Sequence, residues 1–289
     1  PTPLHTSPRN QALQTVAAHE RVFAWHNQAA LWFSLGVGLL VLQMGALLAP
    51  ALGLAGSLWV IGGGSLLGAA LLAWVAHIGA RNGLASAGLM HAVMGRQFAQ
   101  LPVLLNIVQL LGWGAFELVV MREASAAILA KLGWAQPSTG LTVATTLFWG
   151  GLLAVLMLLP MVQAVRKLVA RIALPLVVCA LLWLTWQVLG LASAKGWATL
   201  WAQPGDGSMG RLSALDLVIA MPVSWLPLVA DYARHSRSAR GAFWGTWGGF
   251  ALANAWCYGL GVLIALLLPG TEMMAAVLGI QGGLLALAL

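Results

Sequence analysis

Four polar or aromatic side chains share one face of an apolar stretch that runs from about residue 101 to 129. They are spaced three, four and four residues apart, within about 80° of one another on a helix: Asn106, Gln109, Trp113 and Glu117. A carboxylate at the centre of a membrane-spanning helix costs about 2.5–3.5 kcal/mol on insertion scales, so it is expected to face the protein interior or water. The stripe predicts contact with a heterocycle, in which Trp113 stacks and Glu117 accepts hydrogen bonds. The alternative is a structural Glu117 paired with a basic or amide group of another helix.

A second candidate site is the glycine-rich interruption of the first apolar stretch. Gly36, Val37 and Gly38 are followed by Gln43 in the same stretch. Interruptions of this kind are tolerated at membrane depth where the freed backbone lines a cavity, and free carbonyls suit a cation. We expect these three residues to hold a cation through their backbone and Gln43 to contact the ligand. Kinking or close helix packing is the alternative.

A third candidate lies in the sixth apolar stretch, where Pro222 and Pro227 flank Trp225. Each proline removes a backbone donor and clashes with the preceding turn, so the helix is expected to break between them. Trp225 is then a candidate second stacking plate, with an interfacial or packing role as the alternative. The first and sixth stretches cross the membrane in opposite directions, as in five-helix inverted repeats, whose two broken helices meet near the midplane.

The composition shows what kind of element must position these residues. The chain has 289 residues, of which 61% are hydrophobic and 7% charged, whereas a soluble domain is about 45–50% apolar and a quarter charged. The apolar runs are continuous over about 20 residues, which excludes the short alternating segments of a membrane β-barrel. We therefore expect an all-α polytopic membrane protein.

Eight spans are expected, the last running into the C-terminus: 29–49, 57–78, 101–129, 140–160, 172–192, 214–232, 243–268 and from about 274. Residues 1–28 are expected to be a cytoplasmic segment and 29–289 a transmembrane domain, with a first repeat at about 29–192 and the start of a second at about 214–289. Ten of the 14 Lys and Arg residues then lie on the N-terminal side of the membrane and four on the other. The positive-inside rule places the N-terminus in the cytoplasm.

The charge and histidine patterns exclude other functional classes. The net charge of +7 suits basic cytoplasmic loops, and no nucleic-acid-binding module is recognisable. The histidines have no metal-ligand spacing, no catalytic triad can be picked out, and Glu117 is the one titratable group near a midplane. We therefore expect no metal, no cofactor and no enzyme activity. A membrane-embedded enzyme and a non-transporting membrane subunit are the rivals from other classes.

Several motifs, in order along the chain, resemble the nucleobase:cation symporter-1 family, also called purine–cytosine permeases. They are Leu31-Trp32-Phe33, Gly79-Ala80-Arg81-Asn82-Gly83-Leu84, Trp113-x-x-x-Glu117 and Asp231-Tyr232-x-Arg234. The segments 106–113 and 224–232 are most similar to the hydroxymethylpyrimidine transporter branch. Glu117 stands where many relatives have Gln, and Trp225 lies about three residues nearer Asp231 than the tryptophan of the family.

The resemblance implies a LeuT-like inverted-repeat transporter fold of twelve helices, so the 289 residues are expected to be part of a longer protein. It implies alternating access and Na⁺- or H⁺-coupled uptake across a bacterial-type inner membrane. A planar heterocycle would lie between aromatic side chains of the third and sixth spans, and a cation would be held by carbonyls of the first span and hydroxyls of the eighth. Asp231 and Arg234 would form a structural or gating pair. An acid at position 117 favours a ligand with donors, such as an aminopyrimidine, or a protonated Glu117. We expect hydroxymethylpyrimidine import, with cytosine, purine or allantoin as the alternative.

Overall fold

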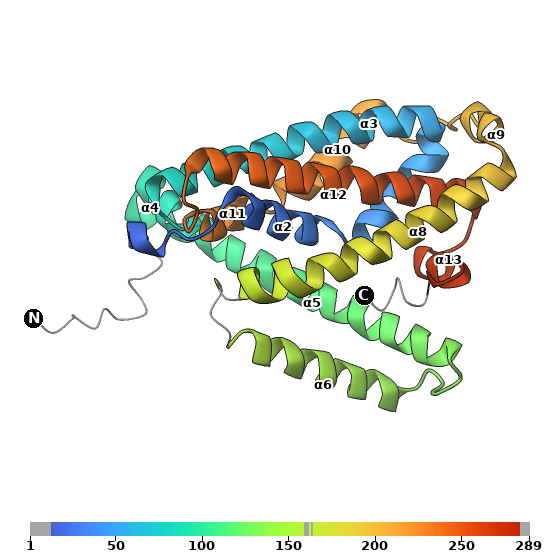
Figure 1. Cartoon of the computed structure of the whole chain (residues 1–289), viewed down its shortest axis with the longest axis horizontal. Coiled ribbons are helices and arrows are strands. Elements are labelled where there is room, and N and C mark those ends of the chain that lie inside the picture. Colours follow the sequence, from blue (N-terminus) through green and yellow to red (C-terminus); the bar gives the residue numbers. More distant parts are fainter. Residues whose placement is uncertain (1–12, 159–161, 163, 284–289) are drawn as a thin grey trace, which may run out of the picture.

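A computed structural model describes residues 13–158, 162 and 164–283, and these are helical nearly throughout (Figure 1). In chain order the elements are η1 (Ala18–Glu20), α2 (Trp25–Gly36), α3 (Leu39–Asn82), α4 (Ser86–Phe98), α5 (Gln100–Lys131), α6 (Thr139–Leu156), the π-helix η2 (Ala164–Ala173), α8 (Leu174–Lys195), α9 (Trp197–Ala202), α10 (Arg211–Val223), α11 (Leu226–Ala233), α12 (Ala239–Leu267) and α13 (Met273–Gly279).

Helix α3 folds back on itself at Gly53 and so supplies two membrane passes. Gly53 has a left-handed backbone (φ 65°) inside the 44-residue helix, and a side chain there would collide with the Gln203 carbonyl. The Ser57 hydroxyl donates to the Leu48 carbonyl at 3.2 Å, although nine residues of straight helix would separate these groups by about 13 Å. The first predicted span is therefore α2 with the beginning of α3, and the second is the rest of α3.

Six helical stretches of the described chain are long and apolar enough to cross a membrane: Leu39–Asn82, Gln100–Lys131, Thr139–Leu156, Lys167–Lys195, Arg211–Ala233 and Ala239–Leu267. Since α3 contains two passes, seven of the eight predicted spans are present. The eighth is wrong over the residues described. Helix α13 has only seven residues, Ile280 is extended, and Gly282 has a φ of 75°, so the helix stops in a turn. The rest of that predicted span, 284–289, lies outside the described residues.

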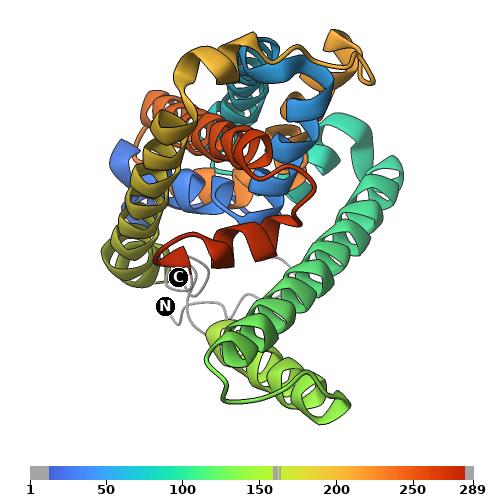
Figure 2. The same cartoon turned by 90° about the vertical axis from the view of Figure 1, so that its right-hand side faces the viewer.

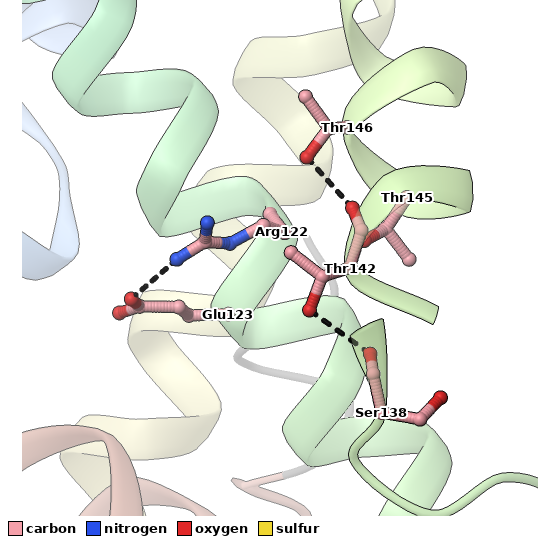
Figure 3. A network of polar contacts seen from close by, with 6 residues as sticks. All are labelled: Arg122, Glu123, Ser138, Thr142, Thr145 and Thr146. Atoms are coloured by element: carbon pink, nitrogen blue, oxygen red, sulfur yellow. Dashed lines mark hydrogen bonds and ion pairs between the residues drawn. The ribbon is translucent and has the colours of Figure 1, made fainter. Parts of the chain in front are cut away.

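Helix α5 continues through two charged residues that stand inside its apolar sequence. Arg122 donates to Glu123 at 2.9 Å, and this pair neutralises both charges on the helix surface (Figure 3). The neighbouring α6 satisfies its hydroxyls internally, because Thr142 and Thr146 donate to carbonyls four residues earlier. These pairings lower the cost of placing the two charges and the two hydroxyls in lipid.

Glycines bring the central helices into close contact. Added side chains at Gly45 of α3 and Gly261 of α12 would collide with the backbone of the partner helix, and one at Gly68 would meet Pro222 of α10. Small residues permit this approach between membrane helices. By contrast, α5 has no buried residue, and Figure 2 shows the α5–α6 hairpin set apart from the bundle.

The segment before α2 ties two helix ends together. The Val16 amide donates to the Gly83 carbonyl at 2.9 Å, after the end of α3. Phe23, which is buried, donates its amide to the His235 carbonyl at 2.9 Å and accepts from the Arg237 amide at 2.8 Å. This N-terminal strap, residues 15–24, therefore bridges α3 and α11 on the predicted cytoplasmic side.

Candidate functional site

The first span breaks where the sequence predicts. Helix α2 ends at Gly36, Val37 is extended (φ −99°, ψ 129°), Gly38 is extended (φ −180°, ψ 161°), and α3 begins at Leu39. The last carbonyls of α2 and the first amides of α3 have no partners within their own helices. The break therefore presents backbone donors and acceptors from residues that are themselves apolar.

A cavity of about 260 Å³ opens beside this break. Its walls come from the break, α5, α8 and α13: Val37, Gly38, Leu39, Leu42, Glu117, Val120, Met121, Ala124, Val177, Ala180, Leu181, Leu184 and Val277. Glu117 is the one ionisable residue among these lining residues. The structure thus brings Glu117 together with Val37 and Gly38, which are 79 positions or more away in the sequence. A carboxylate opposite freed backbone groups can bind a ligand with N–H donors or a cation.

The sixth span also breaks where the prolines predict, but the break is compact. Helix α10 ends at Val223 and α11 begins at Leu226, while Ser224 and Trp225 keep right-handed helical angles. The Leu228 amide donates to the Trp225 carbonyl at 3.0 Å, three residues earlier, so the Ser224 carbonyl is left for another donor.

Two amides of the polar stripe supply donors to this second break. Gln109 donates from Nε2 to the Ser224 carbonyl at 2.7 Å, and Asn106 donates from Nδ2 to the Pro227 carbonyl at 3.1 Å. The stripe is therefore divided between two tasks. Its N-terminal amides position the sixth span, whereas Glu117, two turns further along α5, lines the cavity at the first span.

Trp225 packs against the first span in an aromatic cluster. Its ring lies edge-on to Trp32 of α2, with centroids 6.1 Å apart and planes at 78°. Trp32 is wholly buried, donates to Gln28 Oε1 at 3.0 Å, and contacts Tyr232 and Phe250 at 6.1 and 6.2 Å. The two broken spans are thus joined through a tryptophan pair, which helical spacing within one span cannot reveal.

The remaining predicted ligand contacts are not among the residues that line the cavity. Trp113 precedes Glu117 by one turn, is half-buried, and sits edge-on to Phe116 with centroids 6.0 Å apart. Gln43 is half-buried at the start of α3. Trp225 belongs to the aromatic cluster. The cavity walls from α8 and α13 were missed by sequence reasoning, because Val177, Leu181 and Val277 are apolar residues with no signal that separates them from packing residues.

The polar end of the sixth span contacts other segments on the predicted cytoplasmic side. Asp231 accepts from the Ser86 amide at 3.1 Å at the start of α4. Arg234 and His235 line a cavity with Glu20 of the N-terminal strap. Burial, and then the charge of Arg234, lower the pKa of His235 below its ordinary value of 6.5. These contacts hold the helix end in place.

The chain was compared with protein families and with proteins of known structure. The family model described as permease for cytosine/purines, uracil, thiamine, allantoin matches residues 15–279. No curated protein sequence matches significantly. The fold is similar to that of Mhp1, a nucleobase-cation-symport-1 family transporter in a closed conformation with bromovinylhydantoin bound, with a TM-score of 0.73 and 14% identity. The alignment covers 96% of this chain and 65% of Mhp1.

The structural likeness confirms the predicted all-α, LeuT-like transporter fold, and the chain spans about two thirds of the length of the solved transporter. The family match extends from the N-terminal strap to α13 and confirms the resemblance noted in the motifs. The chain therefore belongs to the family of permeases for cytosine and purines, uracil, thiamine and allantoin.

Proposed function

We propose that the protein is a cation symporter that imports a pyrimidine-like heterocycle by alternating access. One observation carries this proposal: the Glu117 carboxylate shares a cavity with the backbone break at Val37 and Gly38. The rest of the described wall is apolar, and such a wall suits a flat ring whose polar groups are few and directed. The family to which the chain belongs is described by substrates of that kind.

The acid at position 117 narrows the substrate within this class. An ionised carboxylate can only accept hydrogen bonds, so it favours a ring that carries an amino group or ring N–H. Hydroxymethylpyrimidine, an aminopyrimidine, meets this requirement, and we propose the hydroxymethylpyrimidine branch of the family. Trp113 and Trp225 are proposed to stack on the ring in the course of transport, with Gln109 and Gln43 as polar neighbours. Cytosine, a purine or allantoin is the second candidate within the same family.

The coupling ion is proposed to be Na⁺ or H⁺. The carbonyls at Gly36 and Val37 suit a small cation, because unwound backbone in transporters of this architecture coordinates such ions. Gly38 is proposed to belong to the same backbone site, and its carbonyl already accepts from the Val41 and Leu42 amides. If H⁺ is the coupling ion, we propose that it is carried by protonation of Glu117. Asp231 and Arg234 are proposed to act structurally at the cytoplasmic end, with Pro222 and Pro227 fixing the second break.

We also propose the membrane arrangement. The protein lies in a bacterial-type inner membrane with its N-terminus in the cytoplasm. Its transmembrane domain begins at about residue 29, its first five-helix repeat extends to about residue 192, and the second begins at about 214. Lipid, the heterocycle and the cation are its partners.

The test is uptake of labelled hydroxymethylpyrimidine by cells that express the full-length protein, with Glu117→Gln and Trp113→Ala as variants. Glu123→Gln is the matched control, because it removes a carboxylate from the same helix on the surface, away from the cavity. We expect saturable uptake in the wild type and the control, and a loss of about 10- to 100-fold in the Glu117 variant, since a hydrogen bond to a charged group is worth about 1.5–3 kcal/mol.

Competition identifies the substrate. Unlabelled cytosine, uracil and allantoin are added in excess, and only aminopyrimidines are expected to compete. Strong competition by cytosine would show that the substrate is cytosine or a close relative, and the protein would still be a transporter. Uptake that is equal in the Glu117 variant and the wild type would refute the site, and the absence of any uptake with the protein present in the membrane would refute the function.

A further inference from the structure

A second hollow lies on the outer surface of the bundle, away from the site described above. It is a shallow groove of about 370 Å³ between α2, α8 and α12, and its floor and walls include Trp25, Phe33, Leu174, Val178, Trp244 and Leu252. Apart from His26 at its rim, the described lining is apolar or glycine. An apolar groove on a membrane-spanning bundle faces the hydrocarbon tails of lipids.

The three helices that form this groove run in the same direction. Along α12, the glycines at 241, 245 and 249 approach Trp25, then Trp25 and Gln28, then Ala29 of α2, so the two helices advance together. Figure 1 shows α8 starting at the same end as α12. The N-terminal end of the groove is therefore made by the beginnings of three helices, on the predicted cytoplasmic side.

Basic residues gather at that end. Arg171 lies three residues before Leu174 of the groove wall, Arg240 lies four residues before Trp244, and both are exposed. One helical turn therefore separates each arginine from the wall, and helical side chains lean toward the N-terminus. His26 closes the rim on α2. No acidic residue is among the described residues that line the groove, so this end suits an anion.

Two tryptophans mark the depth of the groove in the membrane. Trp25 and Trp244 are 62% and 52% exposed and lie at the basic end. Exposed tryptophans are enriched at the level of the lipid headgroups. From Trp25 to Phe33 the groove follows α2 for about 12 Å, which is close to the thickness of one leaflet of a hydrocarbon core about 30 Å thick.

We propose that this groove binds one anionic phospholipid of the cytoplasmic leaflet. One acyl chain lies along Ala29, Phe33, Val178 and Leu252, and the phosphate faces Arg171 and Arg240. Charge complementarity at one end favours an anionic lipid over a zwitterionic one. The length of the groove matches one leaflet. The inference concerns the lipid-facing surface and does not depend on the transport function proposed above.

The test is native mass spectrometry of the purified full-length protein in detergent, titrated with dioleoyl phosphatidylglycerol or dioleoyl phosphatidylcholine. Gly248→Leu fills the groove, because a side chain at Gly248 meets nothing within 4 Å. Gly259→Leu is the matched control on the same helix, also with nothing within 4 Å and outside the groove. Arg171→Gln with Arg240→Gln removes the charges, and Arg96→Gln is the control for loss of an exposed positive charge.

We expect one phosphatidylglycerol per chain, bound more tightly than phosphatidylcholine. Each basic residue is expected to contribute about fivefold, so the double arginine variant should weaken phosphatidylglycerol binding about 30-fold. It should also remove the preference for this lipid, while Arg96→Gln should do neither. Gly248→Leu should weaken both lipids and Gly259→Leu neither. Inorganic phosphate at the same concentration should not compete, since it lacks the acyl chain.

Unchanged lipid binding in Gly248→Leu would overturn the proposal, as would a preference for phosphatidylglycerol that survives in the double arginine variant. A groove that accepts a helix of a second copy would instead give a Gly248→Leu protein with a changed oligomeric mass and an unchanged lipid count. That outcome also overturns the lipid assignment.

Discussion

Both broken spans are predicted by helix-breaking residues in the sequence, and the two breaks differ in the structure. At the first break, Val37 and Gly38 are fully extended and face a cavity. At the second, Ser224 and Trp225 remain in the right-handed helical region, and the chain turns without opening a gap. Glycine permits the open form because no side chain fills it, whereas two prolines fix φ and favour a tight turn.

The two breaks differ in which groups form hydrogen bonds with the backbone that the helix interruption frees. Within lipid, an unpaired peptide group costs several kcal/mol. The second break uses Gln109 and Asn106 as permanent donors, so its carbonyls are occupied. The first break faces one carboxylate and apolar walls. Its Gly38 carbonyl accepts from the Val41 and Leu42 amides, and its remaining groups are the ones proposed to bind a ligand. A helix interruption therefore indicates a binding site only when no neighbouring side chain already serves the freed groups.

The largest effect should follow from forcing apart the helices that frame the open break. A side chain at Gly45 would collide with the backbone of Tyr258 on α12, and backbone cannot move aside as a side chain can. Gly45→Ala is expected to lower the free energy of unfolding by about 3 kcal/mol, measured by steric trapping or as a lower thermal midpoint.

Gly62→Ala is the control for this change, since Gly62 lies in the same helix and a side chain there meets nothing within 4 Å. It should be neutral or slightly stabilising because alanine favours helix over glycine. If Gly45→Ala proved as stable as Gly62→Ala, the close helix contact would not hold the break open.

A smaller effect is expected when the closed break loses a donor. Gln109→Met leaves the Ser224 carbonyl without its 2.7 Å partner and should cost about 1 kcal/mol, the usual value of a hydrogen bond between membrane helices. The same change at Gln43, which makes no hydrogen bond to the described residues, should leave the thermal midpoint unchanged. Equal midpoints for the two variants would show that the second break does not need its amide.

A third pair of variants separates packing from ligand binding within the open break. A side chain at Gly36 would lie 2.8 Å from the Ala253 side chain, whereas one at Gly38 meets nothing within 4 Å. Gly36→Ala should cost about 1 kcal/mol of stability. Gly38→Ala should cost none, yet it adds a methyl group to the cavity and should weaken ligand binding. Thermal midpoints with and without ligand distinguish the two, and a Gly38 variant with normal ligand binding would argue against the cavity.

The smallest effect concerns pH at the end of the sixth span. The pKa of His235 is lowered by burial and by Arg234, so folding favours the neutral imidazole. Its contribution is complete above pH 6.5, where both states are neutral, and is lost as the pH falls through the folded pKa. Hydrogen exchange of the Phe23 and Arg237 amides should therefore quicken below pH 6.5 relative to His235→Gln, in which the extra dependence should vanish. Identical pH profiles would exclude His235 as its source.

Much of the fold could be predicted because its signals are local. Seven spans follow from runs of apolar residues, and both breaks follow from glycine or proline within such runs. Helix α13 could not be distinguished from the start of a span, because it ends where Ile280 becomes extended, and an isoleucine in an apolar run gives no sign of that. The sequence predicts only a connection between two spans at Gly53. In the structure the helix continues on both sides of this residue, so the connection is a sharp turn within α3.

The site was predictable in part for the same reason. Glu117 and the 36–38 break are a rare acid and a rare interruption, so each stands out in its own span. Their shared cavity, and the use of Gln109 as a structural donor, depend on how α5 packs against two other spans. Helical spacing shows which side chains share a face; it does not show that one face meets two different neighbours.

Helix α5 therefore acts as a rigid rod between the two broken spans. Gln109 donates a hydrogen bond to the sixth span, and Glu117 faces the first span. These two residues are eight positions, or about 12 Å, apart along a continuous helix. A rotation or axial shift of that rod moves both ends at once, with no loop between them to absorb the motion. On the binding proposed for Glu117, a ligand that draws this side chain toward it would also act on the Ser224 turn, and by reciprocity a change in that turn would alter the affinity at Glu117. Helix α5 has no buried residue, so few packing contacts would oppose such a shift.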